Sequence, residues 1–219
     1  NLYGTIQIKN LLMAILAAKV CGLKIEKIFH KINKIESVEG RLQLIRTLPN
    51  KSKIFLDYAH TPEALEKALI SLKEHFHKKI TILFGCGGQR DKTKRRLMGQ
   101  VAKKYCDKIY VTDDNPRKEN AKKIRKEIMK GLKKFPVKEI GNRKTAIINA
   151  MKNSDPYEII LIAGKGHETY QELGNKRIFL SDKHIIKNFN NKSIFSSPKI
   201  NNLRFNSLVL RKTLQSNKN

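Results

Sequence analysis

Short apolar runs alternate along this chain with longer stretches of helical periodicity, and that alternation limits the possible folds more than any other feature. The clearest run is residues 80–84, which are rich in β-branched and aromatic residues and show no alternation with polar positions. This pattern is typical of a strand buried on both faces of a parallel sheet. Strands are expected near residues 54–57, 80–84, 108–112 and 158–163. Helices are expected near residues 62–76, 93–105, 120–134 and 143–153. The alternation predicts right-handed βαβ crossovers and a largely parallel sheet.

Two shorter runs are expected to complete this sheet. One lies near residues 137–140, and the other, 177–180, follows the turn Gly174-Asn175 and is expected to run antiparallel at an edge. Earlier in the chain, residues 7–20 and 25–32 have the apolar spacing of two helices. The predicted fold class is therefore α/β, a Rossmann-like and mostly parallel six-stranded sheet with flanking helices, preceded by a helical segment.

Each of the four main strands is followed by a polar sequence. DYAHTP starts at Asp57, GCGG at Gly85, TDDNPR at Thr112 and GKGHE at Gly164. Ligands of open α/β sheets collect outside the carboxyl ends of parallel strands, so these four endings are expected to meet at one crevice.

The glycine-rich ending is the strongest candidate for a binding loop. Gly85, Gly87 and Gly88 permit a close approach of a ligand to the backbone, and a charged run after them offers donors for anionic groups. That run comprises Arg90, Asp91, Lys92, Lys94, Arg95 and Arg96. The structural alternative is a tight turn followed by a solvated basic helix.

Composition narrows the class of protein. The 219 residues are 40% hydrophobic, enough for one complete domain with an appended piece. There are 46 Lys and Arg residues against 19 Asp and Glu, and the resulting net charge of +27 favours the binding of polyanions. Because the basic residues are scattered along the chain, they predict only non-specific attraction to nucleic acid.

The cysteines and apolar runs exclude other classes of protein. Three cysteines without a Cys-x-x-Cys pair indicate neither a disulfide framework nor a zinc site. The longest apolar run, 11–18, is short of the ~20 residues that span a bilayer, so no membrane association is expected.

The polar sequences, taken in order, resemble the carboxy-terminal part of the Mur ligases over residues from about 4 to 189. DYAHTP, FGCGG followed by RDK, TDDNPR and AGKGHE occur in the family's order, so no single short motif carries the resemblance. Two positions depart from the family pattern: Gln89 stands where the family usually has an acid, and Arg96 where it usually has proline. These departures leave the fine detail of the glycine loop open.

Within the family, the chain resembles the members that add meso-diaminopimelate to UDP-N-acetylmuramoyl-L-alanyl-D-glutamate. The resemblance implies an ATP-dependent amide ligase of peptidoglycan precursor synthesis, in which the glutamate carboxylate is phosphorylated and the diaminopimelate amine attacks the acyl phosphate. The implied ligands are ATP, Mg²⁺, the UDP-N-acetylmuramoyl dipeptide and meso-diaminopimelate, in a monomeric, cytoplasmic enzyme. Mg²⁺ would be held mainly by an upstream domain.

The resemblance also carries roles over to matching positions. For meso-diaminopimelate these are Arg90, Asp114, Asn115, Pro116, Arg117, Gly164 and Glu168. For ATP they are Asn10, Arg41, Asp57 and His60. Lys165 and His167 are expected to be local supports of their loop, and no catalytic residue or metal ligand is implied with certainty.

Ordinary structural roles compete with these assignments at three positions. For Arg117 the structural alternative is that it only pairs with Asp113 or Asp114 and stabilises the turn. His60 has a structural role if it only pins its loop, and Asn10 has one if it lies on a plain packing helix.

The resemblance divides the chain into three parts. Residues 1–47 are expected to end the family's central, ATP-binding domain, residues 48–189 to form the carboxy-terminal, amino-acid-binding domain, and residues 190–219 to form a disordered tail rich in Lys and Asn. The chain starts at Asn1 and contains no G-x-x-x-x-G-K-[ST] sequence, so we expect a fragment that is inactive alone. The alternatives are a binding module or remnant that has lost catalysis, and a basic nucleic-acid-binding protein.

Overall fold

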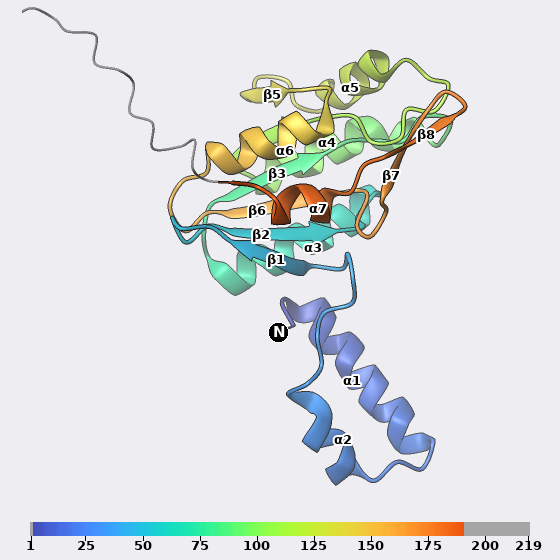
Figure 1. Ribbon diagram of the computed structural model, residues 1–219, viewed down its shortest axis with the longest axis vertical. Coiled ribbons are helices and arrows are strands. Elements are labelled where there is room, and N and C mark those ends of the chain that lie inside the picture. Colours follow the sequence, from blue (N-terminus) through green and yellow to red (C-terminus); the bar gives the residue numbers. More distant parts are fainter. Residues whose placement is uncertain (1, 191–219) are drawn as a thin grey trace, which may run out of the picture. The chain divides into compact units, whose positions relative to one another are not determined.

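The computed structural model describes residues 2–190, and one compact unit ends at Phe189 (Figure 1). The expected tail, residues 190–219, therefore lies outside the described residues except for Asn190. Two helices open the described part as predicted, α1 (Thr5–Val20) and α2 (Ile25–Ile32). The segment just before α1 contacts β2 (Lys53–Asp57), because the ring of Tyr3 lies 5.1 Å from that of Phe55.

A six-stranded sheet dominates the described residues, with the strand order β1-β2-β6-β3-β4-β5. β6 occupies the centre, the pairs from β2 to β5 are all parallel, and β1 runs antiparallel to β2 at one edge. The strands are β1 (Gln43–Thr47), β2 (Lys53–Asp57), β3 (Ile80–Phe84), β4 (Lys108–Val111), β5 (Val137–Glu139) and β6 (Ile159–Ala163). The predicted fold class, α/β with a mostly parallel six-stranded sheet, is confirmed.

Helices cover both faces of the sheet, and each face has its own core (Figure 1). Side chains alternate between the faces of a strand, so Leu161 of β6 joins one core while Ile160 and Ile162 join the other. The first core includes α3 (Pro62–Phe76), α4 (Thr93–Tyr105) and α5 (Ala121–Met129), and the second includes α6 (Arg143–Lys152) and α7 (Asp182–Lys187). This covering of both faces explains why the main strands are almost uniformly apolar.

Side-chain caps start the helices that follow the strands. The Thr61 hydroxyl accepts a hydrogen bond from the Ala64 N–H at 3.3 Å at the start of α3, the helix for which the sequence predicts this cap. Asn120 and Asn142 cap α5 and α6 in the same way. The caps of α3 and α5 mark where the polar loops after β2 and β4 end.

The last predicted strand, near residues 177–180, was expected at an edge of the main sheet, and this prediction was wrong. Lys176–Phe179 forms β8, which pairs antiparallel with β7 (Tyr170–Leu173) in a separate hairpin. Gly174, with φ of 58°, turns the chain tightly between the two strands, so β8 pairs with its immediate neighbour in sequence. The sixth strand of the main sheet is β1 instead.

The strand β1 lies directly before the expected domain boundary, between residues 47 and 48. Gln43–Thr47 is paired with β2 through backbone hydrogen bonds, so these residues belong with the sheet. The side chain of Arg46 in β1 also donates to the carbonyls of Ile186, Lys187 and Phe189, at the end of α7. The sequence did not predict α7, whose contact with β1 closes this edge of the domain.

Candidate functional site

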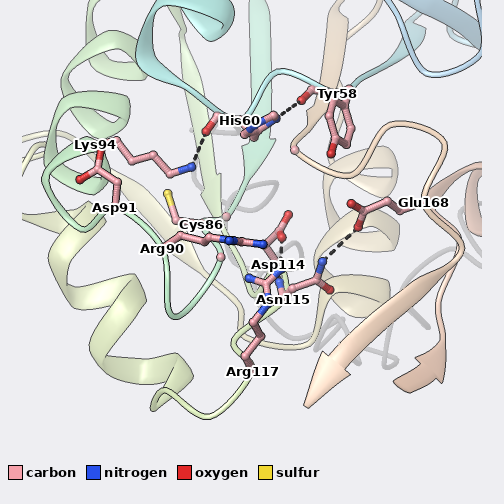
Figure 2. Close-up of a pocket in the computed structure, with 13 residues that line it drawn as sticks. Tyr58, His60, Cys86, Arg90, Asp91, Lys94, Asp114, Asn115, Arg117 and Glu168 are labelled. Carbon is pink, nitrogen blue, oxygen red and sulfur yellow. Dashed lines mark hydrogen bonds between the residues drawn. The ribbon is translucent and has the colours of Figure 1, made fainter. Parts of the chain in front are cut away.

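The polar endings of β2, β3, β4 and β6 surround a cavity of about 360 Å³. Figure 2 shows Arg90 and Arg117 converging beside Asp114 and Asn115, with Glu168 approaching from the loop after β6. Of the seven residues expected to bind an amino acid, the six that line the cavity are Arg90, Asp114, Asn115, Arg117, Gly164 and Glu168. Pro116 is not among the lining residues. The predicted convergence of four strand endings thus matches the arrangement of the loops.

A buried hydrogen-bond network holds the carboxylate of Glu168. Oε2 of Glu168 accepts from Asn115 Nδ2 at 3.0 Å and from Lys165 Nζ at 2.9 Å. Lys165 is fully buried and also donates to Asn115 Oδ1 at 3.0 Å. A buried ammonium needs such partners, so Lys165 joins the loops after β4 and β6 and supports Glu168 as the sequence predicted.

Arg117 is held by a different acid from the two considered in the sequence. Its Nε forms an ion pair with Glu172 Oε2 at 2.8 Å, and its Nη1 donates to the Gly88 carbonyl at 2.9 Å. Asp113 pairs instead with Arg125, and Oδ1 of Asp114 accepts from the Asn115 N–H. The structural alternative, in which Arg117 pairs with Asp113 or Asp114, is therefore not what the structure shows.

The glycines of the loop after β3 permit close approach to protein backbone. A Cβ atom on Gly88 would lie 1.9 Å from the Pro116 carbonyl oxygen, and one on Gly85 would lie 2.4 Å from the Thr112 carbonyl oxygen. The Gly88 N–H also donates to the Asn115 carbonyl at 2.9 Å. The sequence predicted close approach of a ligand, whereas these two glycines first allow the loop to lie against the TDDNPR loop.

Gly88→Ala is expected to destabilise the protein by about 1–3 kcal/mol, because the added methyl group collides with backbone that cannot rotate away. Gly87→Ala is the matched control, since its Cβ would lie 3.0 Å from the flexible end of Arg117 and at an ordinary 3.8 Å from Arg90 and the Asn115 carbonyl. Urea unfolding of both variants measures the difference. Equal stability of the Gly88 variant and the native chain would contradict the close packing of the two loops.

The charged run after the glycines divides into inward and outward side chains. Arg95 is 1% exposed and binds Glu119 and Glu127 at 2.6 and 2.7 Å, so it joins α4 to the neighbouring segments and is not a donor for a ligand. Arg90 and Lys94 line the cavity. Arg95 thus corrects the expectation that the whole run surrounds the opening.

A second cavity, of about 440 Å³, contains three of the four residues expected to bind ATP. Asn10, Arg41 and Asp57 line it, whereas His60 lines the first cavity. Asp57 is buried, which raises its pKa, although N–H groups of Leu42 and Ala59 donate to its two oxygens at 2.7 Å each and favour the charged form. Asp57 therefore ties the segment before β1 to the end of β2.

An aromatic cluster connects the linings of the two cavities. The ring of Tyr58, which lines the first cavity, lies 4.8 Å from that of His60 and 5.5 Å from that of His167. The guanidinium of Arg41, which lines the second cavity, lies 4.8 Å from the centre of the Tyr58 ring. A role for Tyr58 was not predicted from the sequence, although its position inside DYAHTP was an available signal.

A buried ion pair that the sequence did not predict supports the end of β6. Arg143, at the start of α6, and Asp182, at the start of α7, are both fully buried and lie 2.7 Å apart at their closest atoms. Arg143 Nη2 also donates to the Ala163 carbonyl at 3.0 Å, directly before Gly164. Burial opposes the charge on Arg143, but Asp182, with smaller contributions from Asp114 and Glu168, raises its pKa overall.

Two other kinds of chemistry find little support in residues 2–190. Cys86 lines the first cavity, but burial raises the pKa of its thiol to about 12, which disfavours the reactive thiolate. Within this range no cluster of three or more His, Cys, Asp or Glu side chains is placed to hold a metal ion. No helix in the same range has the length and apolar character needed to cross a membrane.

Comparisons with known proteins agree with the motifs. A Rickettsia prowazekii protein named UDP-N-acetylmuramoyl-L-alanyl-D-glutamate–2,6-diaminopimelate ligase is 44% identical over 188 residues, covering 85% of this chain and 38% of its own length. A Clostridium acetobutylicum protein, ligase 1 of the same name, is 41% identical over 190 residues, covering 86% of this chain and 39% of its own length. This chain thus spans about two fifths of the length of these relatives.

Solved structures show the same relationship. A structure of a ligase of that name has a TM-score of 0.67 at 34% identity, covering 85% of this chain and 38% of its own. The Thermotoga maritima UDP-N-acetylmuramate-alanine ligase, at 17% identity and a TM-score of 0.60 over 86% of this chain and 37% of its own, shares the fold. Residues 40–166 match the family described as Mur ligase, glutamate ligase domain. The chain belongs to the Mur ligase family.

Proposed function

We propose that this chain is the carboxy-terminal part of an ATP-dependent ligase that adds meso-diaminopimelate to UDP-N-acetylmuramoyl-L-alanyl-D-glutamate, and that the first cavity holds the incoming meso-diaminopimelate. In this reaction ATP phosphorylates the glutamate carboxylate, and the amine displaces phosphate from the resulting acyl phosphate to form the amide. The names of the similar ligases support this choice of substrates.

The mixed charge of the cavity is the observation that carries the proposal. Its lining contains three cations, Arg90, Lys94 and Arg117, and three carboxylates, those of Asp91, Asp114 and Glu168. meso-Diaminopimelate bears a carboxylate and an ammonium group at each end, so it needs both kinds of partner within one pocket. A cavity with cations alone would favour phosphates, and one with acids alone would favour amines.

The two arginines are proposed to bind carboxylates, because a guanidinium matches a carboxylate with two parallel hydrogen bonds. Asn115 adds a hydrogen bond. Glu168, held in place by Lys165, and the Gly164 carbonyl are proposed to accept from the ammonium group at the end far from the reaction. The oriented carboxylate of Glu168 supports this assignment, since one of its two oxygens already accepts both protein hydrogen bonds.

ATP is proposed to contact the second cavity through Asn10, Arg41 and Asp57. The stacking of Arg41 on Tyr58 would then connect the nucleotide to the amino-acid pocket, where His60 lies. Holding the two reactants in register removes much of the entropic barrier to their encounter. Mg²⁺ and the triphosphate are proposed to be held mainly by a part of the enzyme upstream of these residues.

The test is calorimetric titration of the 219-residue chain with meso-diaminopimelate and with L-lysine. Lysine has the same carbon skeleton and both amines but lacks one carboxylate, so it is the matched ligand. We expect meso-diaminopimelate to bind at least about tenfold more tightly, because hydrogen bonds to a charged group contribute about 1.5–3 kcal/mol each. With ATP and the nucleotide dipeptide added, this chain alone is expected to form no amide product. Equal affinity for the two amino acids would refute the proposed pocket.

A further inference from the structure

The hairpin of β7 and β8 holds the backbone of Arg117. The Arg117 N–H donates to the Glu172 carbonyl at 3.0 Å, and the Gly174 N–H donates to the Arg117 carbonyl at 2.7 Å. These bonds make a short parallel bridge between Arg117 and Leu173. Arg117 has a φ of 53°, in the left-handed region that non-glycine residues seldom occupy, so the hairpin holds it in a conformation that its own sequence does not favour.

Glu172 extends this support to the guanidinium. Its Oε2 forms an ion pair with Arg117 Nε at 2.8 Å, while its Oε1 accepts hydrogen bonds from Arg177 Nε and Nη2 at 3.1 and 3.0 Å. Glu172 does not line the first cavity, and its side chain is 19% exposed against 68% for Arg177. It therefore approaches Arg117 from outside the site.

These contacts leave several N–H groups of the Arg117 guanidinium available to a ligand. A guanidinium has five N–H donors. In this structure its Nε lies in an ion pair with Glu172, and the Gly88 carbonyl accepts one hydrogen bond from Nη1. The second N–H of Nη1 and the two of Nη2 are left for a ligand, and a guanidinium can bind a carboxylate through two parallel hydrogen bonds. Arg117 lines the cavity, so these N–H groups are the part that a ligand can use.

We propose that Glu172 is a positioning residue that determines specificity by holding the guanidinium of Arg117 ready for the distinguishing carboxylate of the amino acid. This inference rests on the proposed function of the cavity. A flexible arginine loses side-chain freedom when it binds, and a protein contact that orders it in advance reduces that loss for the ligand. Glu172 thus favours ligands that use Arg117 and does nothing for those that do not.

The test compares Glu172→Ala with Glu172→Gln in the full 219-residue chain. Glutamine retains an acceptor for Arg117 Nε but has no charge, so it separates positioning from electrostatics. We expect alanine to weaken meso-diaminopimelate binding about tenfold and lysine binding less than about twofold, and glutamine to stay within about threefold of the native affinity. Arg177→Ala is the control, because it removes the other partner of Glu172 without touching Arg117.

A second measurement reports, without any ligand, whether the guanidinium of Arg117 is held in place. The Arg117 Nε–H signal in a ¹⁵N spectrum should exchange slowly with water in the native chain and in the glutamine and Arg177 variants, and rapidly in the alanine variant. A native chain that does not prefer meso-diaminopimelate overturns the proposed function and this inference with it. An alanine variant that retains the native preference and slow exchange overturns only the inference, as does an equal loss of preference in Arg177→Ala.

Discussion

Arg117→Ala is expected to remove the preference for meso-diaminopimelate over lysine, lowering the ratio of affinities by about 10- to 100-fold. The two amino acids differ by one carboxylate, and the guanidinium of Arg117 is the proposed partner of that group. Calorimetric titration with both ligands measures the ratio. Arg96→Ala is the matched control, because it removes the same charge from an exposed position on α4 outside the cavity.

Arg117 also has structural contacts, and the ratio of the affinities for meso-diaminopimelate and lysine separates its structural role from its role in binding the ligand. Its side chain connects Gly88 to Glu172, so alanine is expected to lower stability as well. A purely structural arginine would weaken both ligands in parallel and leave their ratio unchanged. Arg117→Lys keeps the charge but loses the planar fork, so it should recover only part of the preference. A full native ratio in the alanine variant would contradict the specificity argument.

Arg143→Ala is expected to lower the free energy of unfolding by about 3–5 kcal/mol, the usual cost of leaving one buried charge without its partner. Asp182 lies fully buried against Arg143 and would then have to be desolvated without compensation. Because Arg143 also binds the Ala163 carbonyl, the loss should include the corner that precedes Gly164. Urea unfolding followed by circular dichroism measures the change.

A double variant and an exposed pair are the controls for this prediction. Arg143→Met combined with Asp182→Leu replaces both charges with apolar groups and should recover much of the lost stability. Lys183→Ala breaks the neighbouring pair with Glu39, whose side chains are 33% and 57% exposed, and should cost less than about 1 kcal/mol. A loss for Arg143→Ala as small as that for Lys183→Ala would show that the buried pair contributes little.

The central strands could be predicted from sequence because their signals are local. Residues 80–84 and 159–163 are apolar except for Thr81 and are fully buried, and the polar sequences after them mark where each strand ends. β1 has no such signal, since Gln43–Thr47 is only half buried and pairs along one edge. Its place in the sheet depends on β2 and α7, which no local pattern in these five residues indicates.

The site shows the same division between local and distant signals. Motif residues such as Asn115 and Glu168 could be placed because each follows a strand directly. Glu172 and Asp182 could not, because each meets its arginine only after the hairpin and α7 have folded back on the sheet. Charge pairs of this kind join residues tens of positions apart, and a single sequence contains no pattern that connects them.

The position of β6 has a consequence for how this domain is made on a ribosome. β6 is the last strand of the main sheet to be synthesised, yet it lies between β2 and β3, which do not pair with each other. Until residues 159–163 emerge, the growing chain can form only two partial sheets, each with an open strand edge. Open edges recruit other chains, so a nascent chain that stalls before this point is exposed to aggregation. The four loops of the cavity therefore come together only when β6, the last strand of the main sheet, is inserted.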